Sequence, residues 1–137
     1  MKFFAIVCTL LIQSILYVYA QAPLNAGVAI TSPVLNFIPP SNNDQTVVKG
    51  GSNFTISWSI LNKNATRIEK IGLWKGNAAY LTPVILNILK NGSIPVNPPT
   101  YNWTVPTNLT SESDYVLTIV GNNSYTSYSP YFTIKNA

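Results

Sequence analysis

The sequence predicts an all-β protein, an antiparallel β-sandwich of immunoglobulin or fibronectin-III type with seven or eight strands. Several short segments alternate apolar and polar residues, which is the pattern of strands with one buried face. Turn-forming glycine, asparagine and proline pairs separate these segments, and the ten prolines argue against long helices. Short strands at this regular spacing, within roughly 100 residues, are typical of such a sandwich.

The clearest strand covers residues 54–60. Side chains alternate between the two faces of a strand, so we expect four of them to point into the core: Phe54, Ile56, Trp58 and Ile60. The same alternation in residues 101–105 and 114–120 directs six more inward: Tyr101, Trp103, Val105, Tyr115, Leu117 and Ile119. Weaker candidate strands cover residues 28–31, 46–48, 68–74, 84–89 and 129–134.

A tyrosine corner is predicted at the start of the strand at 114–120. Leu109 is followed by a polar turn over residues 110–114 and then by Tyr115. In this motif the phenol hydroxyl bonds to the backbone a few residues upstream and fixes the entry of the strand. An ordinary core tyrosine is the alternative.

The ends of the chain indicate a secreted protein. Lys2 precedes an apolar run that ends at Ala20, which fits a signal peptide over residues 1–20 and a single β-sandwich domain over residues 21–137. An uncleaved membrane anchor is the alternative, but the run is interrupted and shorter than the roughly 20 apolar residues that an anchor needs. The C-terminus has no GPI-attachment pattern. We therefore expect a secreted protein, extracellular or in a cell wall, with no stable membrane anchor; the sequence does not indicate its oligomeric state.

The composition argues against catalysis. There is no histidine, and the single cysteine, Cys8, lies in the predicted signal peptide; the usual Ser-His-Asp and Cys-His arrangements and the usual zinc ligands are therefore missing. Of the four carboxylates, only Glu112 and Asp114 are close in sequence, and they lie in the polar turn. We expect no enzyme activity, no metal site and no cofactor. The net charge of +4 comes from scattered lysines, so no nucleic-acid partner is expected.

Six Asn-x-Ser/Thr triplets could accept N-linked glycans. They begin at Asn53, Asn64, Asn91, Asn102, Asn108 and Asn122. Chance alone predicts about three such triplets in a chain this rich in Asn, Ser and Thr, so the sequence indicates some enrichment. Asn64, Asn91 and Asn122 lie in expected loops and are the best candidates.

Exposed aromatic side chains are the candidate carbohydrate contacts, because the apolar face of a sugar stacks on flat rings. Trp74 is out of phase with its core-facing neighbours Ile71 and Leu73. Three tyrosines gather near the last strand: Tyr125, Tyr128 and Tyr131. Loop packing and cross-strand pairing are the alternative roles. Trp58 and Trp103 are in phase with the core.

The order of motifs resembles one fungal domain family. The segments at 30–33 (ITSP), 48–58 (VKGGSNFTISW), 101–106 (YNWTVP), 114–117 (DYVL) and 129–134 (SPYFTI) are similar to the N-terminal domain of the yeast cell-wall synthesis proteins tied to β-1,6-glucan. The same domain occurs in fungal Ser/Thr-rich GPI-anchored proteins. The resemblance implies an extracellular sandwich in a cell-wall setting and no catalytic set.

The functional expectation follows from that resemblance and the composition. We expect a secreted, non-catalytic, cell-wall-associated protein that takes part in wall organisation or binds glucan, with wall polysaccharide or mannoprotein as its partner. The alternative is a secreted protein-interaction module of effector or adhesion type.

Overall fold

The computed structural model describes residues 24–36 and 44–136. The predicted signal peptide, residues 1–20, lies outside this range. The described residues form twelve strands and no helix. The strands are β1 (Val28–Ser32), β2 (Leu35–Asn36), β3 (Asp44–Gln45), β4 (Val47–Lys49), β5 (Asn53–Ile60), β6 (Arg67–Lys75), β7 (Thr82–Ile85), β8 (Ile94–Pro95), β9 (Thr100–Thr104), β10 (Glu112–Gly121), β11 (Thr126–Tyr128) and β12 (Phe132–Lys135). Within those residues there is accordingly no helix that could cross a bilayer.

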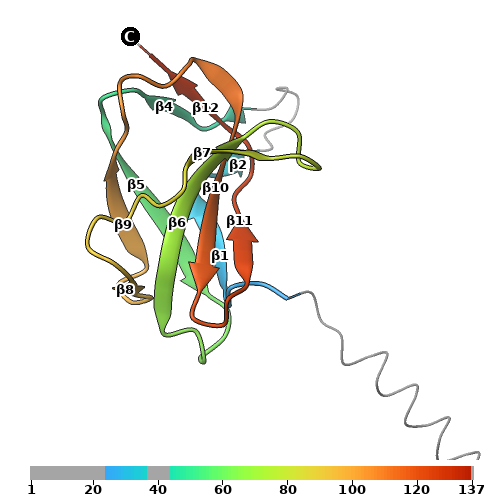
Figure 1. The fold of residues 1–137 in the computed structure, drawn as a ribbon, viewed down its shortest axis with the longest axis vertical. Coiled ribbons are helices and arrows are strands. Elements are labelled where there is room, and N and C mark those ends of the chain that lie inside the picture. The colour runs from blue at the N-terminus through green and yellow to red at the C-terminus, as the bar shows by residue number, and fades with distance from the viewer. Residues whose placement is uncertain (1–23, 37–43, 137) are drawn as a thin grey trace, which may run out of the picture.

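Two sheets form the body of the domain (Figure 1). The smaller has the order β1-β5-β9, with every pair antiparallel. The larger has the order β4-β12-β10-β6-β7, with β11 paired to β10 and β8 paired to β6. A separate ladder joins β2 to β3. The all-β sandwich predicted from the sequence is confirmed.

The number and pairing of strands differ in detail from the expectation. Seven strands of the described chain have four or more residues, and the other five are pieces of two or three residues. These short pieces lack the alternation that sequence reading requires. One pair departs from the antiparallel rule, because β4 runs parallel to β12 at the edge of the larger sheet.

Side chains from both sheets form one core. The smaller sheet contributes Val28, Ile56, Trp58 and Trp103, and the larger contributes Ile71, Leu73, Tyr115, Leu117, Ile119, Phe132 and Ile134. The indole N–H of Trp58 donates to the carbonyl of Val96 at 3.0 Å, so the buried ring leaves no polar group unpaired. Trp58 and Trp103, the two tryptophans expected in the core, are both buried in it.

A buried serine connects the two sheets. The Ser127 hydroxyl on β11 accepts the backbone N–H of Ala26 at 3.1 Å and donates to the carbonyl of Val28 at 2.8 Å. Ala26 and Val28 belong to the segment that enters β1 of the other sheet. One side chain thus holds this edge of the sandwich closed.

The tyrosine corner is present as predicted. The Tyr115 hydroxyl donates to the carbonyl of Thr110 at 2.7 Å, and Leu109 is buried. The turn between β4 and β5 also follows its sequence signal, since Gly51 has a φ of 83°, a conformation that favours glycine.

Two expectations about burial and strand limits were wrong. Ile60 was expected in the core but is 43% exposed, because it is the last residue of β5 and lies beyond the core at the end of the sheet. The predicted strand at 84–89 is β7, which ends at Ile85. Beyond it the Asn87 side chain accepts from the backbone N–H groups of Ile71 and Leu89 and replaces regular strand pairing.

Candidate functional site

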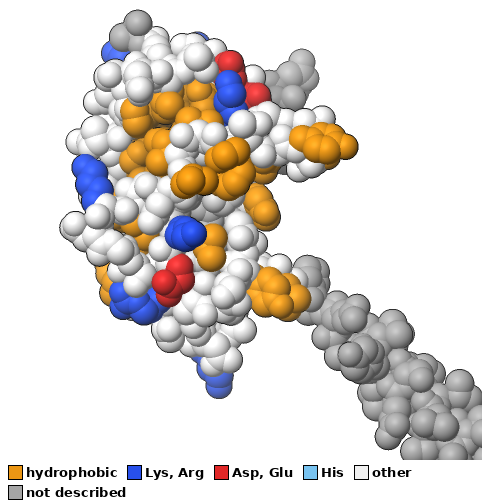
Figure 2. Space-filling model, viewed as in Figure 1, with side chains coloured by type: hydrophobic (Ala, Val, Ile, Leu, Met, Phe, Trp, Pro, Cys, Tyr) orange, Lys and Arg blue, Asp and Glu red, His pale blue; other side chains and the backbone are white. Residues whose placement is uncertain are grey.

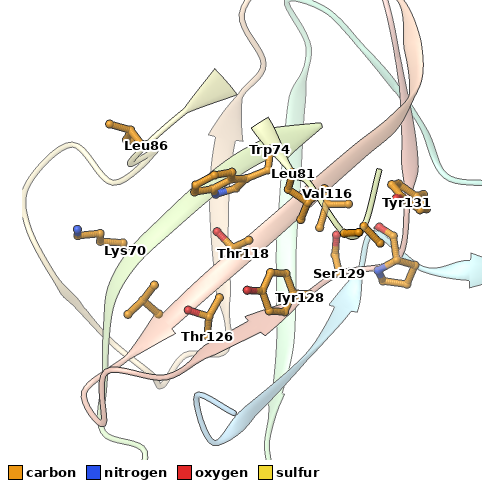
Figure 3. A pocket seen from close by; sticks show the side chains of 14 residues that line it. Lys70, Trp74, Leu81, Leu86, Val116, Thr118, Thr126, Tyr128, Ser129 and Tyr131 are labelled. Carbon is orange, nitrogen blue, oxygen red and sulfur yellow. The ribbon is translucent and has the colours of Figure 1, made fainter. Parts of the chain in front are cut away.

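A groove of about 700 Å³ lies on the outer face of β6, β10 and β11. On this face the register brings Trp74 of β6 beside Val116 of β10, and Thr118 of β10 lies beside Tyr128 of β11. Figure 3 shows Trp74 and Tyr128 on opposite sides of Thr118. The groove volume is within the usual range for small-ligand sites, roughly 300–1,000 Å³.

Gly72 lies on β6 between Lys70 and Trp74, two residues that line the groove. It is paired with Thr118 across β6 and β10. A Cβ atom at Gly72 would lie 2.8 Å from both the Thr118 hydroxyl oxygen and the Trp74 indole nitrogen. A polar N–H and a hydroxyl therefore converge over the glycine, next to an aromatic face. Among the described residues neither group has a hydrogen-bond partner, so both can serve a ligand.

The loop between β6 and β7, residues 76–81, forms one side of the groove. Its residues Ala78, Ala79 and Leu81 line the groove. The Tyr131 hydroxyl donates to the carbonyl of Gly76 at 2.8 Å and fixes the start of the loop. In Figure 2 the loop projects from the body, and the surface is hollowed below it, with hydrophobic side chains gathered over β6 and β7.

The electrostatics of the groove are simple. Lys70 is the charged residue among its lining residues, and no carboxylate is among them. An ion pair lies outside the groove, where Lys75 Nζ is 2.9 Å from Glu112 Oε2. The hydrogen bond between these groups raises the pKa of Lys75 above 10.5 and lowers the pKa of Glu112 below 4.5. The groove suits a largely neutral ligand with apolar faces and hydroxyl groups.

The structure brings together three of the four predicted contact residues. Trp74, Tyr128 and Tyr131 line the groove, whereas Tyr125 lies outside it. Tyr125 belongs to the turn between β10 and β11, four residues after β10 ends at Gly121. Its neighbour Thr126, the first residue of β11, lines the groove instead.

Sequence reading missed the floor of the groove. Val116 and Thr118 are on the outer face of β10, yet both are buried. The signal was present: residues 115–120 (YVLTIV) are nearly continuously apolar, which indicates a strand covered on both faces. Gly72 was missed because its role depends on the side chains beside it.

The six asparagines of the N-glycosylation triplets are all exposed, and none lines the groove. Asn53 and Asn102 lie on β5 and β9, and the other four lie in loops and turns: Asn64, Asn91, Asn108 and Asn122.

Within the described ranges, no group of three or more carboxylate, cysteine or histidine side chains is placed to hold a metal ion.

Comparison with known proteins identifies the domain. Residues 40–134 match the family model of the Kre9/KNH-like N-terminal Ig-like domain. No curated protein matches the sequence. Among solved structures, the chain is similar to the fibronectin(III)-like modules of Clostridium thermocellum CbhA, at 18% identity and a TM-score of 0.40 over 80% of this chain. It spans about half, 46%, of that structure's length. The family match covers most of the sequence, and the chain belongs to the Kre9/KNH-like N-terminal Ig-like domains, a family related to fungal cell-wall glucan synthesis.

Proposed function

We propose that this domain is a secreted, non-catalytic component of the fungal cell wall that binds a neutral β-glucan chain in the groove between Trp74 and Tyr128. The observation that carries the proposal is the grouping of aromatic rings, an indole N–H and a hydroxyl on one sheet face. The family relationship supplies the class of ligand, since its members are tied to glucan of the cell wall.

The chemistry of the groove supports a sugar as the occupant. Sugars present apolar C–H faces that stack on aromatic rings, and equatorial hydroxyls that take part in hydrogen bonds. Trp74 and Tyr128 offer such rings on two sides of the groove, and Thr118 offers a hydroxyl between them. Tyr128 is 61% exposed, so its ring is available before any ligand binds.

A binding role is favoured over catalysis by the placement of the carboxylates. Glycoside hydrolysis requires two carboxyl groups roughly 5–10 Å apart across the bound sugar. Glu112 is engaged with Lys75, and the residues that line the groove contribute no acid. The groove is therefore suited to holding a glucan chain rather than cleaving it.

Retention on insoluble β-1,6-glucan tests this function. The full chain, secreted from a yeast host, is mixed with the polymer, and the bound and free fractions are measured. We expect retention of the wild type and at least a tenfold loss of affinity for Trp74→Ala and Tyr128→Ala, because an aromatic side chain that becomes buried on binding contributes about 2 kcal/mol or more. Tyr125→Ala is the matched control, since this exposed tyrosine lies outside the groove, and it should be retained like the wild type.

The same experiment separates the competing functions. Flow-through of the wild type from β-1,6-glucan, β-1,3-glucan and chitin alike would contradict glucan binding and would favour a protein-interaction module. Equal losses for Tyr125→Ala and Trp74→Ala would show that retention does not use the groove. Release of soluble sugar by the purified protein would contradict a non-catalytic role.

A further inference from the structure

The outer face of the smaller sheet carries two N-glycosylation triplets that face each other. The first, residues 53–55, lies on β5, and the second, residues 102–104, lies on β9. The antiparallel register pairs Asn53 with Thr104 and Thr55 with Asn102. Each asparagine is therefore directly opposite the threonine that completes the other triplet.

Hydrogen bonds link the two triplets in both directions. The Thr104 hydroxyl donates to Asn53 Oδ1 at 2.9 Å, and the Thr55 hydroxyl donates to Asn102 Oδ1 at 2.9 Å. In the part of the chain that the structure describes, neither asparagine Nδ2 has a hydrogen-bond partner. The amide oxygen of each side chain is held, while the nitrogen that would carry a glycan is free.

Asn122 shows the opposite arrangement. Its Nδ2 donates to the carbonyl of Asn64, and its Oδ1 accepts from the backbone N–H of Thr66. The Asn122 amide thus connects the β10–β11 turn to the segment before β6. A glycan on this nitrogen would disturb a contact that shapes the end of the sandwich.

We propose that Asn53 and Asn102 carry a pair of N-linked glycans on the outer face of the β1-β5-β9 sheet, with the threonine of each triplet orienting the glycan of the other. In each transfer, asparagine Nδ2 forms a bond to the anomeric carbon of a lipid-diphosphate-linked oligosaccharide. The bond from that carbon to the diphosphate oxygen breaks, and Nδ2 loses one proton. Nothing is oxidised or reduced.

The position of the pair explains what the glycans would do. Diagonal neighbours on one face of an antiparallel pair are roughly 7–8 Å apart, so the two glycans stand side by side. They cover the smaller sheet, and both asparagines are absent from the groove lining on the larger sheet. Figure 1 shows β5 and β9 on the left of the domain and β11 on the right. Glycosylation would therefore shield one face and leave the groove open.

The inference rests on the proposed secretion of the chain. Two measurements on one sample distinguish a failure of the glycan inference from a failure of the proposed function. The full chain is expressed in yeast, and occupancy of each triplet is measured by glycopeptide mass spectrometry alongside retention on β-1,6-glucan. We expect glycans at both Asn53 and Asn102. A secreted protein without glycans at these two positions would overturn the inference, even if it binds glucan. A protein with both glycans that fails to bind glucan would overturn only the groove. A chain that stays unmodified inside the cell would overturn secretion and the inference together.

Matched variants test the reciprocal support. Asn102→Gln and Thr104→Val both remove the Asn102 triplet, but only Thr104→Val removes the hydroxyl bonded to Asn53. We expect native-state glycan release from Asn53 by a peptide-N-glycosidase to be roughly three- to tenfold faster in Thr104→Val than in Asn102→Gln, the factor expected from one net hydrogen bond. Thr104→Ser keeps the hydroxyl and should behave like the wild type. Equal release rates in Thr104→Val and Asn102→Gln would contradict the orienting role.

Discussion

Replacement of Ser127 by alanine should destabilise the domain by about 2–4 kcal/mol. The Ser127 hydroxyl is buried and makes two hydrogen bonds, one from the backbone N–H of Ala26 and one to the carbonyl of Val28. Alanine removes both bonds, each worth roughly 1 kcal/mol net, and leaves a buried N–H and carbonyl that can cost a further 1–3 kcal/mol. Water that reaches this edge of the sandwich would offset part of that cost.

Thermal unfolding followed by circular dichroism measures the effect. At about 4 °C per kcal/mol for a domain of this size, the midpoint should fall by about 8–16 °C. Ser59→Ala is the control, since Ser59 is exposed on β5, and such surface changes usually alter stability by less than about 0.5 kcal/mol. If Ser127→Ala unfolded within about 2 °C of the wild type, the two Ser127 hydrogen bonds would not hold the sheets together.

Three other changes have distinct readouts. Tyr115→Phe removes the corner hydroxyl and should cost about 1 kcal/mol in denaturant unfolding, with unchanged slope; a loss below about 0.3 kcal/mol would mean that water replaces the bond. Gly72→Ala places a methyl group 2.8 Å from the Trp74 indole nitrogen. It should shift tryptophan fluorescence and weaken glucan retention, at a stability cost of about 1 kcal/mol. Unchanged retention would contradict glucan binding beside Trp74. Because Lys75 lowers the pKa of Glu112 below 4.5, the ion pair stabilises the protein above that pH, and this stabilisation is lost on acidification. The unfolding midpoint of Glu112→Gln should therefore depend less on pH between about pH 5 and 3 than the midpoint of the wild type, which declines more steeply there.

The sequence revealed the fold because its strongest signals are local. Alternation over residues 54–60 and 114–120, glycine turns and the spacing from Leu109 to Tyr115 each act within a few residues. The structure bears out these elements, including the hydroxyl bond from Tyr115 to Thr110. Ile60 was misplaced because alternation gives the direction of a side chain but not where the core ends.

The groove was only partly predictable. Phase alone placed Trp74 on the outer face of its strand, and clustering drew attention to Tyr128 and Tyr131. Their association depends on the pairing of β6, β10 and β11, which sequence spacing does not reveal. Tyr125 lies outside the groove, since proximity in sequence to Tyr128 does not fix a common face.

The reciprocal arrangement of the two glycosylation triplets was hidden for a related reason. Nearly fifty positions separate the two triplets in the chain. Only the register of β5 with β9 places Asn53 opposite Thr104. Long-range strand pairing is therefore the information that the sequence motifs lacked.

The most direct test of glucan binding in the groove is a calorimetric titration of a soluble β-1,6-linked gluco-oligosaccharide into the wild type and Trp74→Ala. If glucan binds in the groove, the wild type has one binding site, with the negative heat-capacity change of apolar burial, and the variant binds at least tenfold more weakly. Absence of binding by the wild type, or equal affinity in both proteins, would contradict binding in the groove.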